Sequence, residues 1–198
     1  MSDIPISREE AWKLILKHNS ERSDLNHYLE SEAVMRELAT HLKLKPEKIE
    51  YWAILGLLHD VDWGITKNNV ETHLTKAPEI LEEAGFANEF IENILSHGYG
   101  FNELPHLAHK VRTEKVEHAL AASETVTGLI HAYALMRQGR VSDMDPNGLK
   151  KKYKDKTFAA KVDRSVIKEA EELGITLEEF FSIAIEGIKK IKDKVGLS

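Results

Sequence analysis

Residues 54–63 read Ile-Leu-Gly-Leu-Leu-His-Asp-Val-Asp-Trp, an apolar run with helical character that ends on an imidazole and a carboxylate. Polar groups placed directly after a core-facing run cost free energy unless a partner offsets their burial. A metal ion bound by His59 and Asp60 would be such a partner. The dipeptide alone also fits a hydrogen-bonded core histidine beside a solvated aspartate, so a metal site requires further ligands elsewhere in the chain.

Four further residues are candidate ligands, and each lies in or beside a stretch with a helical pattern: His27, His73, His97 and Glu124. The chain has no cysteine, which excludes disulfides and thiolate ligands. Imidazole and carboxylate donors suit divalent transition metals such as Mn, Fe, Co, Ni or Zn. We therefore predict one or two divalent ions of this group as the cofactor.

The order His, His-Asp, His, His, acid resembles that of the HD superfamily of metal-dependent phosphohydrolases. The resemblance is to small stand-alone HD proteins and extends over nearly the whole chain. It is carried by four segments: Leu57 to Asp62, Ser96-His97, Glu124 to Ile130 and Phe158 to Arg164. The resemblance implies that His27, His59, Asp60 and Glu124 surround a first ion. It also implies that Asp60 bridges to a second ion held by His73 and His97.

Glu124 departs from the pattern of that family, which usually has an aspartate four residues before a glycine. Here Glu124 precedes Gly128 at this spacing, and the neighbouring Ser123 is too short and too neutral to replace a carboxylate. The longer side chain can still reach an ion if its helix lies farther back or the ion shifts. We therefore keep Glu124 as a predicted metal ligand.

Hydrophobic periodicity predicts an all-α protein, because no useful stretch alternates with the period of a strand. We expect an HD-like helical bundle that forms a single domain over residues 1–198. Its helical core would span about 20–137, and a C-terminal helical extension would span about 140–198. Capping boxes that begin at Ser7 and Thr176 mark the starts of two helices.

Three further helix starts and ends bear on the candidate ligands. Asp24 is expected to cap a helix that carries His27 in its first turn. Pro46 suits the first position of the helix that ends at His59-Asp60. The longest predicted helix extends from Thr113 to Met136, with Glu124 near its middle.

Composition limits the classes of function. The chain has 198 residues, 42% hydrophobic and 30% charged, and a net charge of −6, which is typical of a globular protein. This charge disfavours extended nucleic-acid binding and binding to anionic membranes. No signal sequence and no apolar run of about 20 residues is present, so we expect a cytoplasmic protein without a membrane segment. A homo-oligomer is compatible with these features.

Two further groups of residues are candidates for substrate binding and catalysis. A lysine-rich cluster within residues 150–164 could receive a phosphorylated substrate, and Arg164 and Lys154 are our choices within it. A solvated surface is the simpler interpretation of such a cluster. Asp60 and Asp62 are the predicted catalytic carboxylates. Asp62 either orients a ligand histidine, or holds a metal-bound water, or lies in solvent.

The predicted function is hydrolysis of a phosphate ester or phosphoanhydride by a metal-activated water, on a nucleotide or another small phosphorylated metabolite. Two alternatives remain open. One is a di-iron oxygenase resembling myo-inositol oxygenase, which would need iron and consume oxygen. The other is a non-catalytic, ligand-sensing HD module in which Glu124 has weakened the first ion.

Overall fold

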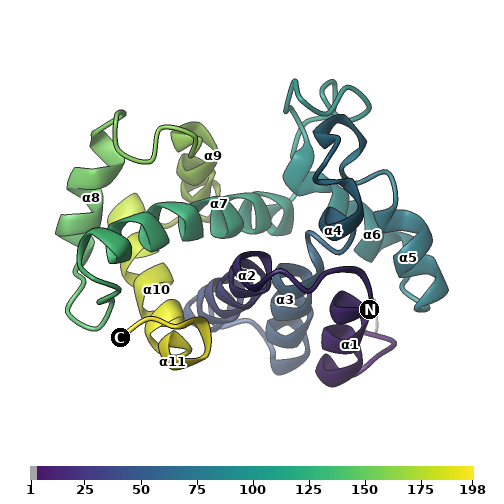
Figure 1. The fold of residues 1–198 in the computed structure, drawn as a ribbon, viewed down its shortest axis with the longest axis horizontal. Coiled ribbons are helices and arrows are strands. Elements are labelled where there is room, and N and C mark those ends of the chain that lie inside the picture. The colour runs from purple at the N-terminus through teal and green to yellow at the C-terminus, as the bar shows by residue number, and fades with distance from the viewer. Residues whose placement is uncertain (1–3) are drawn as a thin grey trace.

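The computed structural model describes residues 4–198, and all regular elements in this part of the chain are helices (Figure 1). The predicted all-α class is therefore confirmed. The α-helices are α1 (Arg8–His18), α2 (Arg22–His41), α3 (Pro46–Leu58), α4 (Trp63–Thr66), α5 (Ala77–Glu83), α6 (Asn88–Leu95), α7 (Lys115–Met136), α8 (Pro146–Lys154), α9 (Arg164–Lys168), α10 (Leu177–Lys189) and α11 (Lys192–Val195). Three short 3₁₀ segments are η1 (Val70–Thr72), η2 (Ser96–Gly98) and η3 (Glu169–Leu173).

Several helix starts are where the local sequence places them. Ser7 and Thr176 both form complete capping boxes, at the starts of α1 and α10. Pro46 is the first residue of α3, which ends immediately before His59. Since a cap satisfies backbone N–H groups within one turn, these starts depend on nearby residues alone.

The start of α2 differs from the prediction. The helix begins at Arg22, and Glu21 is its cap residue. The Asp24 side chain accepts hydrogen bonds from Asn19 and Lys67 instead of capping the helix. As a result His27 lies in the second turn of α2, not in its first.

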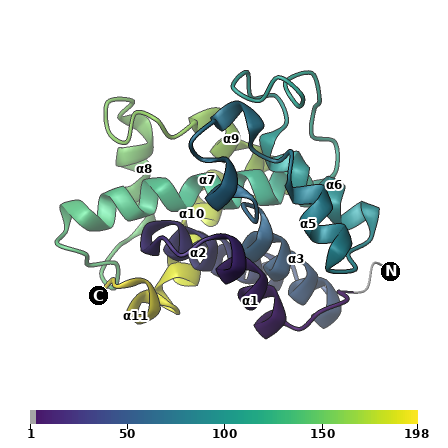
Figure 2. The same ribbon diagram turned by 45° about the vertical axis from the view of Figure 1, so that its right-hand side comes forward.

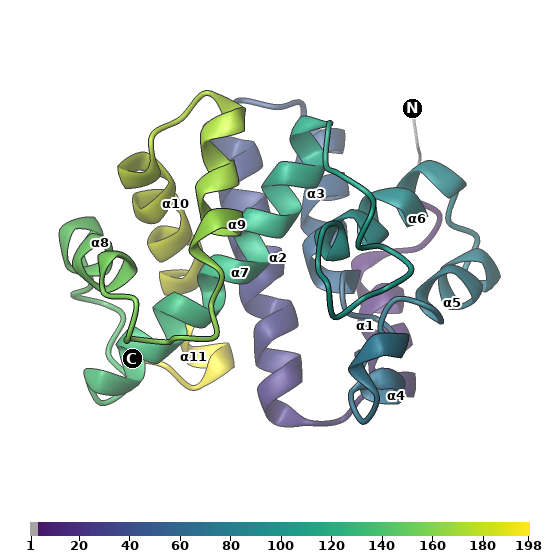
Figure 3. The same ribbon diagram turned by 90° about the horizontal axis from the view of Figure 1, so that it is seen from above.

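Helix α2 is the centre of the packing and contacts α3, α7 and α10 (Figure 3). Two glycines permit very close approach to it. A Cβ added to Gly56 of α3 would lie 2.6 Å from the carbonyl oxygen of Ser31, and one added to Gly187 of α10 would lie 2.8 Å from that of Ala33. The backbones of α3 and α10 therefore touch the backbone of α2.

The C-terminal helices belong to the same hydrophobic core as the preceding ones. Phe180 and Phe181 of α10 are fully buried in one cluster with Met35 and Leu38 of α2. No boundary in the core separates the predicted extension from the predicted helical core. Helix α7 crosses the molecule, with α8 toward one end and α4, α5 and α6 toward the other (Figures 1 and 2). None of the helices in residues 4–198 is long and apolar enough to cross a membrane.

Candidate metal centre

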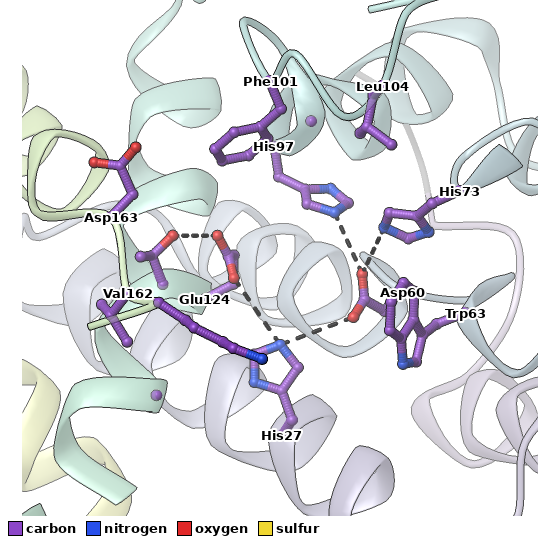
Figure 4. A pocket seen from close by; sticks show the side chains of 14 residues that line it. His27, Asp60, Trp63, His73, His97, Phe101, Leu104, Glu124, Val162 and Asp163 are labelled. Atoms are coloured by element: carbon purple, nitrogen blue, oxygen red, sulfur yellow. Dashed lines mark hydrogen bonds and ion pairs between the residues drawn. The ribbon is translucent and has the colours of Figure 1, made fainter. Parts of the chain in front are cut away.

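Four histidines converge on the carboxylate of Asp60, and Figure 4 shows three of them, His27, His73 and His97. Its Oδ1 lies 3.1 Å from Nε2 of His73 and 3.3 Å from Nε2 of His97. Its Oδ2 lies 3.5 Å from Nε2 of His59 and 3.9 Å from Nε2 of His27. The two oxygens of one carboxylate thus face two different pairs of histidines.

Segments distant in sequence bring these side chains together. His27 is on α2, whereas His59 and Asp60 directly follow α3. His73 directly follows η1, and His97 is the middle residue of η2 after α6. Because α2 and α3 pack backbone to backbone at Gly56, the Nε2 atoms of His27 and His59 are only 3.0 Å apart.

Backbone carbonyls fix the orientation of two of the rings. Nδ1 of His59 lies 2.8 Å from the carbonyl oxygen of Gly56, and Nδ1 of His97 lies 2.7 Å from that of Ile94. A carbonyl only accepts, so each Nδ1 carries a hydrogen, and Nε2 of each ring faces the cluster. Nε2 of His97 therefore faces a carboxylate oxygen of Asp60, and a cation bound between these two atoms would stabilise the arrangement.

A hydroxyl fixes His27 in the same way. The Thr127 Oγ1 group donates to the carbonyl oxygen of Glu124 at 2.6 Å, so it accepts the bond from Nδ1 of His27 at 2.9 Å. The Nε2 lone pair of a neutral His27 therefore points at that of His59. Two imidazoles in this arrangement are stable only when a proton or a metal cation lies between them.

The pKa values of the cluster match these roles. Burial, partly offset by the charge of Asp60, lowers the pKa of His59 to about 3, so this ring is neutral at pH 7. Burial opposes protonation of His73, but hydrogen bonds to Asp60 and Asp62 raise its pKa to about 10. Burial likewise opposes ionisation of Asp60, yet the surrounding histidines hold its pKa well below the usual value. In metal binding, the ion replaces the proton on His73.

Asp62 supports the cluster from behind. Its side chain is fully buried, and its Oδ1 accepts from Nδ1 of His73 at 3.0 Å. Its Oδ2 accepts from the backbone N–H groups of Lys76 and Ala77 at 3.0 and 3.2 Å, at the start of α5. Of the three interpretations of the sequence, the structure has the one in which Asp62 orients a ligand histidine, and the solvent-exposed alternative is wrong. Asp62 is not among the residues that line the cavity over the cluster.

Glu124 lies beside the cluster, near the middle of α7. Its Oε2 is 4.0 Å from Nε2 of His27, and its other oxygen accepts from the hydroxyl of Thr125. Burial raises the pKa of Glu124, and the neighbouring His97 and His27 limit that shift. Among the described residues, two groups have ligand atoms close enough to hold an ion. One group is His27, His59 and Asp60, and the other is Asp60, His73 and His97. Glu124 is adjacent to the first of these groups.

A cavity of about 350 Å³ opens over the cluster. It is formed in part by Asp60, by the three histidines that face Asp60 in Figure 4 and by Glu124. The cavity is also lined by the apolar residues Trp63, Phe101, Leu104 and Val162 and by the charged residues Lys161 and Asp163. The volume and the apolar lining are those of a small-molecule site.

The two residues predicted to bind substrate lie outside this cavity. The Arg164 guanidinium donates to the backbone carbonyls of Ala159 and Val162, each at 2.6 Å, and to that of Phe158. Arg164 thus holds the loop before α9 in place. Lys154 is exposed at the end of α8 and does not line the cavity.

Lys161 is the cation that sequence reasoning did not select, although it belongs to the same lysine-rich cluster. It lines the cavity over the histidines and remains exposed to solvent. The sequence offered one indication of this position. Lys161 lies within the segment from Phe158 to Arg164 and precedes Val162, an apolar residue that also lines the cavity.

Comparison of the chain with protein-family models, with curated proteins and with solved structures gave no match. What the structure establishes is a helical protein with a cluster of histidines and an aspartate that could hold metal.

Proposed function

We propose that this protein is an HD-type, metal-dependent phosphohydrolase that acts on a small phosphorylated molecule. The observation that supports this proposal is the position of the Asp60 carboxylate between two pairs of imidazole nitrogens. Each of its two oxygens faces a different pair. Asp60 would hold one ion together with His27 and His59 and a second ion together with His73 and His97. When bound, such ions lower the pKa of a water molecule to about 7 and polarise phosphate oxygens.

The residues of the chain supply geometry and charge. Asp62 and the carbonyls of Gly56 and Ile94 hold three of the rings with Nε2 inward, which prepares the site for metal. Lys161 supplies positive charge for the phosphate beside the cluster. The apolar lining that includes Trp63 excludes water from the remainder of the substrate. The size of the cavity favours a metabolite or a single nucleotide over a polymer.

The test combines metal analysis of the purified protein with phosphate release from nucleotides and generic phosphoesters. We expect bound transition metal and phosphate release without oxygen. Asp60→Ala should lower metal affinity by roughly 100-fold and abolish turnover, because a ligand to both ions is lost. Asp24→Ala is the matched control, since the side-chain hydrogen bonds of Asp24 in residues 4–198 are with Asn19, Ser23 and Lys67.

Two outcomes would replace the proposal by the alternatives. Iron-dependent oxygen consumption without phosphate release would indicate a di-iron oxygenase built on the same ligands. Substoichiometric metal in a gently purified protein, together with no turnover of any substrate, would indicate a ligand-sensing module.

A further inference from the structure

A second cavity, of about 510 Å³, lies beside the cavity of the metal centre. The two cavities share two lining residues, His27 and Gly128. The second one is formed by α2 and α7 and contains polar side chains that the proposed mechanism does not use, among them Arg22, Asn26 and His131. The proposed mechanism assigns no ligand to this second cavity.

Gly128 interrupts the interior of α7, where glycine is an unfavourable residue. Close backbone contacts explain Gly56 and Gly187, since a Cβ at either would collide with α2. At Gly128 an added Cβ would meet only the side chain of Val162, at 3.3 Å, among the described residues. Backbone packing therefore does not require this glycine. Its lack of a side chain leaves space at the junction of the two cavities.

The polar groups of the second cavity favour an anion that also carries hydroxyls. The Arg22 guanidinium donates to the carbonyl of Lys194 at 2.6 Å, and no described carboxylate forms an ion pair with it. The bond to Glu30 raises the pKa of His131, and the nearly buried Glu30 carboxylate balances the charge of that ring. Because Glu30 balances His131, the charge of Arg22, unpaired among the described residues, gives the second cavity a net positive charge. Asn26 also lines this cavity, and its Oδ1 is buried without a partner in residues 4–198, so a hydroxyl that reached it would supply the missing hydrogen bond.

We propose that the substrate of the metal centre extends across Gly128 into this second cavity, where Arg22 and His131 bind a second phosphate and Asn26 a hydroxyl. The substrate class is then a bisphosphorylated polyol, such as a sugar bisphosphate. One phosphate lies at the metal centre and the other lies between α2 and α7. This inference rests on the proposed hydrolysis of a phosphorylated substrate.

Calorimetric titration of the purified protein with glucose 6-phosphate and glucose 1,6-bisphosphate tests the second phosphate. We expect the bisphosphate to bind about tenfold more tightly, which is the effect of one charge-assisted contact. Arg22→Ala should remove this preference. Arg140→Ala is the matched control, because Arg140 is exposed and also donates to a backbone carbonyl. Equal affinities in the wild type, no binding of either sugar, or a preference that survives Arg22→Ala would overturn the inference.

Gly128 variants test the passage between the cavities. Gly128→Ala meets only the side chain of Val162, at 3.3 Å, which must shift slightly, and the higher helix propensity of alanine should keep the melting temperature at or above that of the wild type. Gly128→Leu should reduce the preference for the bisphosphate to less than about twofold, because its side chain would fill the junction of the two cavities. A folded Gly128→Leu protein with an undiminished preference would contradict the proposed path.

Hydrolysis of p-nitrophenyl phosphate by the same preparations separates the two proposals. Selective binding of the bisphosphate without any hydrolysis would contradict the proposed function alone. Hydrolysis without selectivity for the bisphosphate would contradict the second-cavity inference alone.

Discussion

The carboxylate of Asp62 determines which nitrogen of His73 is free to bind metal. One of its oxygens accepts from Nδ1 of His73, and the other accepts from two backbone N–H groups at the start of α5. Since an ionised carboxylate only accepts, Nδ1 keeps its hydrogen and Nε2 faces Asp60. Asp62 would therefore act on metal binding without touching the ion.

Asp62→Asn is expected to weaken binding of the ion at Asp60, His73 and His97. The asparagine oxygen would remain with the backbone N–H groups, which places its NH₂ group against Nδ1 of His73 and moves the ring hydrogen to Nε2. Metal titration should show a loss of about 10- to 100-fold at this group. The group of His27, His59 and Asp60 should retain its ion. Unchanged affinity in Asp62→Asn, with Asp24→Asn as the control, would show that the hydrogen bond does not set the tautomer.

At the scale of elements, the contact between α2 and α3 sets the distance between two ligands. His27 is on α2 and His59 follows α3, and the crossing at Gly56 brings their Nε2 atoms within 3.0 Å. Both side chains are anchored to their own surroundings, His27 to Thr127 and His59 to Gly56. A small separation of the two helices therefore acts directly on the metal centre.

Gly56→Ala should separate these helices. The new methyl group would lie 2.6 Å from the carbonyl oxygen of Ser31, so the backbones must move apart. We expect a loss of about 1–3 kcal/mol in the free energy of unfolding, measured with urea, together with weaker metal binding. Gly128→Ala is the control for helix propensity, since its methyl group meets only a side chain. Equal stability and equal metal affinity in the two variants would contradict this account.

A second inter-element contact holds the segment that carries His97. The Arg112 guanidinium donates to the carbonyls of Ser96 and Tyr99 on either side of that residue, at 2.9 and 2.8 Å. It also pairs with Glu169 of η3 through two bonds of 2.6 Å. Glu169 additionally contacts Nδ1 of His118. The C-terminal part of the chain thus fixes the position of η2.

Glu169→Gln should destabilise the protein in a pH-dependent way. Burial opposes ionisation of Glu169, but bonds from Arg112 and His118 lower its pKa below the usual value. A lowered folded pKa contributes stability above the unfolded value of about 4.5, and this contribution is lost as the pH falls through the folded pKa. We expect the wild type to be about 2–3 kcal/mol more stable at pH 7, with a difference that shrinks at pH 4 and below.

Urea unfolding at several pH values measures this difference. Glu178→Gln is the control, because its pair with Lys150 is exposed and should matter little. A wild-type advantage over Glu169→Gln that stays constant from pH 7 to pH 3 would show that the ionised carboxylate is not its source.

At the scale of the whole molecule, metal binding would join segments that otherwise meet only through packing. The ligand atoms come from α2, from the end of α3, from the residue after η1 and from η2. An ion bound only by the folded state stabilises that state by mass action. Metal content and thermal stability should therefore change together.

Removal of metal with a chelator should lower the melting temperature. At a free metal concentration 1,000-fold above Kd the ion contributes about 4 kcal/mol. For a chain of this size that corresponds to roughly 8–16 °C. Restoring the metal should reverse the loss, and the Asp60→Ala protein should not respond to either step. A melting temperature that is indifferent to metal in the wild type would mean that the cluster binds no ion in the folded protein.

The sequence by itself determined the features that depend on neighbouring residues. The capping boxes at Ser7 and Thr176 and the proline at position 46 mark helix starts, because each acts within one helical turn. The same holds for the end of α3 at His59. Resemblance then selected histidines that the structure brings together, although it could not show that they meet.

Only the tertiary structure decided how these side chains face one another. The contact of His27 with His59 depends on the crossing of α2 and α3. The backbone N–H group of Lys76, which donates to Asp62, lies at the start of α5. The sequence also did not distinguish the roles of Arg164, which binds a loop, and Lys161, which lines the cavity. Both cations lie in the same lysine-rich segment, and local sequence does not show which of them faces the cavity. Helix caps follow from interactions a few residues apart, whereas a site follows from the packing of helices, which local sequence does not specify.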